Sequence, residues 1–482
     1  MRPIPRHFRF LLPTLALYAA LVGAIVYHHE PWRDEADSWL AARDLTVPQI
    51  FRFSAYVGSP ATWYLILAPF ARLGAPYAVM GWVHAAIAIA AAAIFLRYAP
   101  FPMITRGLAL FSYYLAYEYA VVARNYSLLA LMLFTTASLY ARRRERPIAF
   151  AIALFFLFNT TTHGALFAAI IATAVAWQWL RDRPIDRRAV AALAVILGGA
   201  IAAAIQLWPP ADSQRPEFFM LRAPGAIVDV LTRAVATPIG SPMLDPLWLL
   251  MNLAVLGAAT VYLIHRPVVF VVWIAGMLGL FYIFLFKWVV PERHAGIVLL
   301  WLLFALWIAQ AQPAAQSRVR WWRTAMVALS VALAPACVRT VFAAVDDVRF
   351  EYSHARQMGQ FIVAHDLDRR PIAATNLAEA VLPYLRCRQV WNVHTRRWQS
   401  HNPWDQTFQN NFFLRGPEVW DRLEQYFPLG QRPLILSEWP LPYAREHGYE
   451  LLYRTQGRVP PTKEEFYLYA PLDAAAPAKI RD

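Results

Sequence analysis

The segment from His28 to Trp39 holds the densest group of chemically active side chains in the sequence. It reads His28-His29-Glu30-Pro31-Trp32-Arg33-Asp34-Glu35-Ala36-Asp37-Ser38-Trp39 and follows the first hydrophobic run. If this segment is helical, Glu30, Asp34 and Asp37 share one face and Glu35 is turned away. Carboxylates crowded on one face raise at least one pKa or bind a cation. The alternative interpretation is a solvated, acidic helix start.

The same residues allow metal binding but do not require it. Asp34 and Asp37 suit a hard divalent cation, and His28 and His29 suit zinc. The residues from Asp34 to Asp37 also spell a helicase box. Helicase chemistry needs a phosphate-binding, glycine-rich loop with a lysine, and the chain contains no Gly-Lys pair, so this function is excluded.

Arg124 lies between two hydrophobic runs, in the segment from Tyr117 to Leu128. An arginine there is suited to bidentate recognition of a phosphate. Glu118 and Tyr126 in the same segment are additional candidates for the site. The alternative for Arg124 is a side chain that extends to the lipid headgroups.

Two further groups carry candidate phosphate-binding residues. His163 lies in a turn, Thr160 to Gly164, as a candidate phosphate ligand or acid–base group. Lys287, Arg293 and His294 form a cationic group before another hydrophobic run. The alternatives are a structural role for His163 and interfacial anchoring for the cationic group.

The composition is that of a membrane protein. The chain has 482 residues, of which 59% are hydrophobic and only 16% are charged. Its net charge of +14 does not indicate a nucleic-acid partner, because the basic residues form short clusters between apolar runs.

Eleven apolar runs predict membrane-spanning helices, the first of them an uncleaved signal anchor. They lie at about 8–27, 77–96, 103–122, 125–141, 147–162, 164–180, 189–208, 246–264, 267–286, 294–311 and 323–344. Run 60–73 is shorter than a span and fits an interfacial or re-entrant helix within the first loop, residues 28–76.

Loop charge predicts the orientation of these spans. With eleven spans, the loops on the side of the N-terminus hold 17 Arg against three acids, which places the N-terminus in the cytoplasm and the C-terminus outside. The acidic segment and the cationic candidates then all fall at extracytoplasmic helix ends, where we expect a shared aqueous cavity. We expect a multi-pass protein of the inner, or plasma, membrane.

The composition changes after residue 345, which divides the chain into a membrane domain, 1–345, and a soluble extracytoplasmic domain, 346–482. The pattern predicts helices at 352–366, 377–386 and 418–427. It predicts strands at 371–375, 389–393, 433–437, 449–455 and 466–469. This alternation is typical of a small α/β domain.

The order of the short motifs resembles the GT-C glycosyltransferase superfamily, in particular its branch of protein O-mannosyltransferases and the aminoarabinose transferase of lipid A. The motifs are Asp34-Glu35-Ala36, then Gly58 to Leu65, Ala123 to Leu128, Thr162-His163-Gly164 and Pro291 to His294. The resemblance covers about residues 10–311. The chain departs from it at Ser59-Pro60-Ala61, which lacks the usual paired prolines, and by the absence of a lysine in that segment.

The resemblance implies an inverting transfer of a sugar from a polyprenyl-phosphate donor to an envelope glycan, lipid or protein. Asp34 would be the general base and Glu35 its companion. Arg124, His163 and Arg293 would bind the donor phosphate, together with Lys287 and His294. Such a substitution needs a base for the nucleophile and positive charge for the departing phosphate, and these residue types provide both.

Two functions of other classes compete with this interpretation. A transporter would place its ionisable residues near the middle of the membrane, whereas the centres of these runs are almost free of charge. A protein that only binds an envelope component through its soluble domain would retain its function when Asp34 is mutated.

Overall fold

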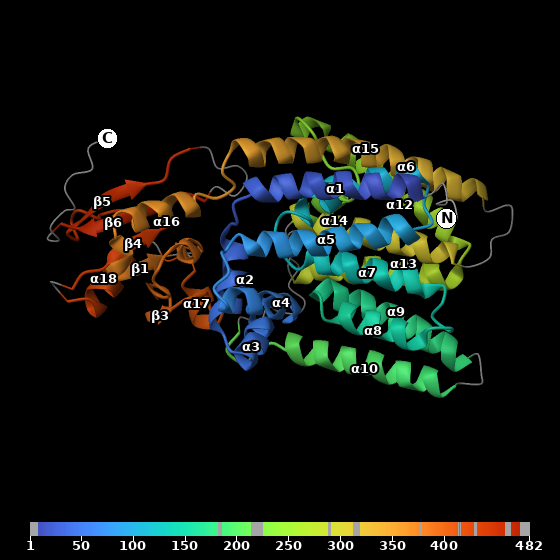
Figure 1. Ribbon diagram of the computed structural model, residues 1–482, viewed down its shortest axis with the longest axis horizontal. Helices are drawn as coiled ribbons and strands as arrows, with labels where there is room; N and C mark the ends of the chain where they lie inside the picture. Colours follow the sequence, from blue (N-terminus) through green and yellow to red (C-terminus); the bar gives the residue numbers. More distant parts are fainter. Residues whose placement is uncertain are drawn as a thin grey trace, which may run out of the picture.

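The structure is a computed structural model in which residues 8–181, 186–213, 225–287, 291–311, 319–375, 378–412, 414, 416–428, 431–457 and 464–472 are described. It consists of a bundle of roughly parallel helices and a smaller α/β region at one end of that bundle (Figure 1). The N-terminus lies at the opposite end of the bundle (Figure 1).

Eight helices within the described ranges are long and apolar enough to cross a membrane. Each coincides with a predicted run, and the prediction of a polytopic helical membrane protein is confirmed. These helices are α1 (Phe8–His28), α5 (Val79–Tyr98), α9 (Thr162–Arg181), α10 (Arg187–Leu207), α12 (Asp245–Ile264), α13 (Pro267–Phe286), α14 (Pro291–Gln310) and α15 (Val319–Arg349).

The predicted number of eleven is not reached in the described part of the chain, because three runs do not form long helices. Run 125–141 forms α7 (Tyr126–Tyr140, 15 residues) and run 147–162 forms α8 (Pro147–Phe158, 12 residues). These helices rise about 22 and 18 Å, less than the roughly 30 Å of a hydrocarbon core. Run 103–122 is divided into α6 (Met103–Leu110) and a π-helical turn, η1 (Tyr114–Glu118). The orientation in the membrane stays a prediction.

The central helix of the bundle is α14, and 89% of its most apolar stretch is buried in the protein. Gly296 allows its first turn to approach η1, since a Cβ atom there would lie 2.4 Å from the ring of Tyr114. The hydroxyl of Tyr119 donates a hydrogen bond to the carbonyl of Arg293. This close packing fixes Arg293 and His294 at the start of α14.

Three short helices occupy the end of the bundle that faces the α/β region: α2 (Arg33–Asp44), α3 (Val47–Val57) and α4 (Thr62–Arg72) (Figure 1). The uncertain run 60–73 forms α4, whose 11 residues are too few to cross a membrane. α3 ends at Gly58, where φ is 64° and a glycine is favoured. The carbonyl of Gly58 accepts a hydrogen bond from the hydroxyl of Thr162, which joins these short helices to α9.

The α/β region contains one six-stranded sheet with the order β3-β2-β1-β4-β6-β5. β1 pairs in parallel with β2 and β4, and the other pairs are antiparallel. The strands are β1 (Ile372–Thr375), β2 (Val390–Asn392), β3 (Arg397–Gln399), β4 (Leu434–Ser437), β5 (Tyr449–Arg454) and β6 (Tyr467–Pro471).

The helices of this region are α16 (Ala355–Ala364), α17 (Gln406–Asn410) and α18 (Pro417–Tyr426). The predicted helix at 377–386 is a 3-10 helix, η5 (Ala378–Tyr384), and β3 and α17 had not been predicted.

One apolar core joins α2 and α4 to the α/β region. Ala36 and Trp39 of α2 are buried in the same cluster as Met358, Val381 and Leu436. α15 also continues past residue 345 and ends at Arg349. α2 is therefore held between the bundle and the sheet, and both sides of the helix have partners.

Candidate active site

The position at which α2 begins determines the part of the molecule that each carboxylate faces. Trp32 precedes the helix, and its backbone N–H donates to the carboxylate of Glu35 at 3.2 Å. Glu30 lies before the helix, so the predicted common face of Glu30, Asp34 and Asp37 is wrong. Glu35 is turned away from Asp34 and Asp37, as predicted, and its fully buried side chain contacts other groups than those two carboxylates do.

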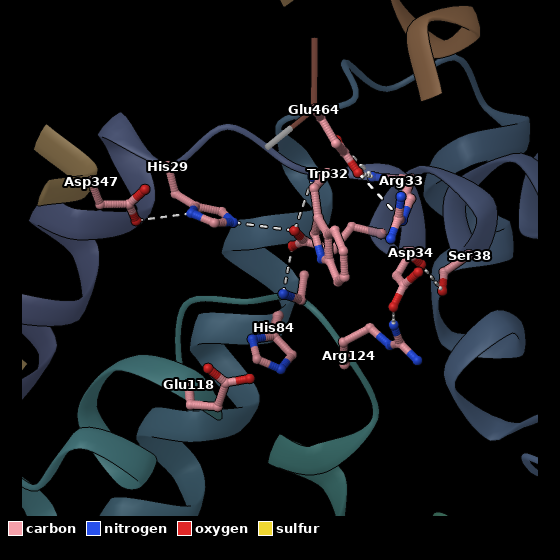
Figure 2. Close-up of polar contacts among 12 residues, drawn as sticks. His29, Trp32, Arg33, Asp34, Ser38, His84, Glu118, Arg124, Asp347 and Glu464 are labelled. Atoms are coloured by element: carbon pink, nitrogen blue, oxygen red, sulfur yellow. Dashed lines mark hydrogen bonds and ion pairs between the residues drawn. The ribbon is translucent and has the colours of Figure 1, made fainter. Parts of the chain in front are cut away.

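Asp34 contacts two arginines of the bundle. Its Oδ2 atom accepts hydrogen bonds from Nη1 of Arg293 at 2.8 Å and from Nη1 of Arg124 (Figure 2 shows the latter contact). Burial alone would raise the pKa of Asp34, but the two guanidinium groups outweigh it and hold this pKa well below its usual range. The side chains of Asp34 and Arg124 are each 27% exposed, so this cluster is in contact with solvent.

Arg293 is held by further contacts. Its Nε atom lies 3.7 Å from Oε1 of Glu118, and the other carboxylate oxygen, Oε2, accepts a hydrogen bond from Tyr113 at 3.0 Å. Its guanidinium lies 4.3 Å from the centre of the Trp32 ring. Glu118 therefore orients Arg293.

His163 and His294, the two histidines predicted to bind phosphate, lie together beside Arg293. The rings of His163 and His294 are 5.1 Å apart, and the ring of His294 stacks on Phe284 and lies 6.4 Å from Tyr126. The Nε2 atom of His163 is buried and has no hydrogen-bond partner. Lys287 follows the last residue of α13 and is half-buried; its role at a phosphate site stays a prediction.

A buried network fixes the loop that carries Arg124. Glu35 accepts a hydrogen bond from the backbone N–H of Ala123 at 2.6 Å and lies 3.2 Å from Nε2 of His29. Nδ1 of His29 lies 2.8 Å from Asp347 at the end of α15 (Figure 2). Burial alone would lower the pKa of His29, but Asp347 and Glu35 raise it to about 10. Asp347 was not predicted as a site residue, and the pair Asp346-Asp347 at the end of the last run was its only signal.

The neighbouring side of α2 contacts the α/β region. Arg33 donates to Glu438 at 2.8 Å, and its backbone N–H donates to Glu464 at 3.2 Å. Glu30, just before the helix, accepts a hydrogen bond from the backbone N–H of Arg356. Burial raises the pKa of Glu30 to about 8 against the charge of Arg356.

Asp37 also belongs to this side. Its carboxylate accepts hydrogen bonds from Nε1 of Trp404 at 2.8 Å and from the backbone N–H of Asn402 at 3.2 Å. Sequence reasoning missed both partners, which lie in a segment without a recognisable motif.

The proposed metal ligands do not form a metal site. No group of three His, Cys, Asp or Glu side chains that could hold a metal ion occurs among the residues that the structure describes. His28 is exposed, while Asp34 is paired with two arginines and His29 with two carboxylates.

No protein-family model matches the chain, and no curated protein matches its sequence. One similar solved structure is that of the arabinofuranosyltransferase AftD from mycobacteria, with 13% identity and a TM-score of 0.43. The match covers 96% of this chain and 40% of that chain. The function of the site therefore has to be inferred from its geometry.

Proposed function

We propose that the protein is a membrane glycosyltransferase that moves a sugar from a polyprenyl-phosphate donor to an acceptor of the cell envelope, with inversion at the anomeric carbon. The observation that carries this proposal is the contact of one carboxylate, Asp34, with two arginines, Arg124 and Arg293, at one end of an apolar helix bundle.

The two arginines provide a site for the donor phosphate. Guanidinium groups bind phosphate oxygens through paired hydrogen bonds, and that of Arg293 is held in addition by Glu118 and Trp32. A phosphate bound between them competes with Asp34 for the same donors. The Asp34 carboxylate is then released from its ion pairs, and its pKa rises toward the ordinary value.

The released carboxylate acts as the general base. It takes the proton of an acceptor hydroxyl, whose oxygen forms the new bond to the anomeric carbon while the bond from that carbon to the phosphate oxygen breaks on the opposite face. The electron pair of the broken bond leaves with the polyprenyl phosphate, and Arg124 and Arg293 stabilise the added negative charge. Glu118 and Glu35 hold these groups in place, as the contacts above describe.

The position of the site favours this function over transport. The charged cluster lies at the ends of the helices, next to the α/β region, whereas a transporter carries its site near the middle of its spans. By the loop charges, we place this end on the extracytoplasmic side of the plasma membrane, where lipid-linked sugars and envelope acceptors meet.

The experiment compares strains that carry wild-type protein, Asp34→Asn or Asp44→Asn in a deletion background. Envelope glycans and lipid-linked sugars are quantified by mass spectrometry. We expect Asp34→Asn to lower transfer by about 10³-fold and to accumulate the lipid-linked donor, because the base is lost. Asp44 lies at the other end of α2 and pairs with Arg43, so its variant is the matched control. Wild-type glycans in the Asp34→Asn strain would overturn the proposal.

A further inference from the structure

The loop between β3 and α17, residues 400–405, reaches α2 through Asp37. Trp404 and Asn402 of this loop donate the two hydrogen bonds to the Asp37 carboxylate described above, across more than 360 positions of the sequence. Asp37 lies one helical turn after Asp34. The loop of the α/β region therefore stands next to the residue on which the proposed chemistry depends.

Asn402 carries a hydrogen-bonding atom that the fold does not use. The residue is only 4% exposed, and its side-chain oxygen has no hydrogen-bond partner. A buried amide oxygen without a donor is unfavourable and is uncommon in folded proteins. A hydroxyl group of a bound ligand would satisfy it.

Trp404 shows a second departure from ordinary structure. Its backbone has a φ of 53°, in the left-handed region that a bulky side chain rarely adopts. Such conformations gather at binding sites, where surrounding contacts hold them in place. Here the indole N–H is fixed by Asp37, and the indole remains partly exposed.

The carboxylate between these two residues can exchange hydrogen bonds with hydroxyl groups. Burial raises the pKa of Asp37 to about 7, against the hydrogen bonds from Trp404 and Asn402, so that both protonation states occur near neutral pH. The charges of Asp34 and Arg124 also act on Asp37, which places it within electrostatic reach of the proposed reaction centre.

We propose that Asp37, Asn402 and Trp404 form an acceptor subsite, which binds a carbohydrate chain and presents one of its hydroxyl groups to Asp34. A carboxylate, an unsatisfied amide oxygen and the face of an indole are groups that recognise a polyhydroxylated ring. This inference rests on the proposed function and adds the class of acceptor and the contribution of the α/β region.

The test uses the full chain in lipid nanodiscs and two probes. One probe is undecaprenyl phosphate, for the donor site. The other is the oligosaccharide fraction released from the envelope of a deletion strain, for the acceptor subsite. The variants are Asn402→Ala and Trp404→Phe, which keeps a ring but removes the indole N–H. The matched controls are Asn410→Ala on α17 and Trp398→Phe on β3, two residues that are exposed.

We expect both variants to weaken oligosaccharide binding by about tenfold or more, which corresponds to one or two lost hydrogen bonds. Binding of undecaprenyl phosphate should change by less than about twofold, and the controls should bind both probes like the wild type. A variant that loses both probes is misfolded. In that case Asn402→Ala decides the question, since the oxygen that it removes makes no hydrogen bond within the fold.

Two results would overturn the acceptor subsite alone: oligosaccharide binding that is absent in the wild type or unchanged in the variants, and displacement of the oligosaccharide by an envelope peptide fraction. Failure of the wild-type protein to bind undecaprenyl phosphate would instead remove the proposed function. The two failures are thus distinguishable in one set of measurements.

Discussion

On the side of α2 that faces the helix bundle, Asp34 contacts two arginines, whereas on the side that faces the α/β region, Asp37 contacts a tryptophan and a backbone amide. The arginines hold the pKa of Asp34 below its usual range, and burial raises the pKa of Asp37 to about 7. Two carboxylates one turn apart thus have opposite environments. Such a difference is typical of catalytic sites in which two carboxyl groups have different roles.

The other buried carboxylates at the contact between the α2 segment and the α/β region follow the pattern of Asp37. Burial raises the pKa of Glu464 to about 8 against the charge of Arg33, much as it does for Glu30. We infer that the charged groups on the bundle-facing side of α2 interact with a phosphate. The groups on the other side bind the α/β region and carry little net charge. The following experiments change one side at a time.

Among these experiments, the largest effect is expected from the removal of Arg293. The variant Arg293→Ala should lower transfer by about 10²-fold to 10³-fold, because it removes a positive charge at the departing phosphate. Arg293→Lys should recover only part of the activity, since an ammonium lacks the planar pair of donors. Activity is measured as incorporation of labelled sugar into the envelope fraction. Equal activity of Arg293→Ala and wild type would contradict a phosphate site at Arg293.

The second effect concerns the network of Glu35, His29 and Asp347. The variant Asp347→Asn should lower the free energy of unfolding by about 3 kcal/mol, because it removes one partner of a buried charged group. Transfer should fall as well, through displacement of the Ala123–Arg124 backbone that Glu35 holds. Thermal unfolding in detergent measures the first change. The control is Asp346→Asn, and a variant Asp347→Asn as stable as this control would show that the network is dispensable.

The pH dependence of stability provides the third test. His29 has a pKa of about 10 in the folded protein and about 6.5 when unfolded, so the folded state binds the proton more tightly. This stabilisation is fully present below about pH 6.5 and is lost as the pH rises through about 10. We expect the unfolding midpoint to fall between pH 7 and about pH 10.5, and to fall less in His29→Gln. A midpoint with equal pH dependence in both proteins would refute the charged pairing of His29.

Sequence reasoning could identify the residues of the bundle-facing side, because each lies at the end of a hydrophobic run. Asp34, Arg124 and Arg293 stand at such ends, and a count of eleven runs predicts that these ends share one side of a membrane. Hydropathy does not show where an apolar run is broken into shorter elements, so it predicts one span for run 103–122. Its residues from Ser112 to Tyr119 form turns whose tyrosine hydroxyls need partners.

The other side of α2 could not be predicted, because its partners come from distant parts of the chain. Nothing near Trp404 or Glu438 in the sequence indicates a contact with residues 33–37. The predicted grouping of Glu30 with Asp34 failed for a local reason. It assumed a helix that includes Glu30, whereas the helix begins after Pro31 and Trp32.

The smallest effect is expected from Arg33, the neighbour of Asp34 that faces the α/β region. Arg33→Ala removes the ion pair with Glu438 and the contact with Glu464. Arg33 is about one third exposed, so solvent screens its ion pairs and the free energy of unfolding should fall by only about 1 kcal/mol. Transfer should change by less than about threefold. Thermal unfolding and the incorporation assay, run beside Arg293→Ala, measure both quantities. A loss of transfer in Arg33→Ala as large as that in Arg293→Ala would remove the distinction between the two sides of α2, because a residue that docks the α/β region would then act as strongly as one that binds the phosphate.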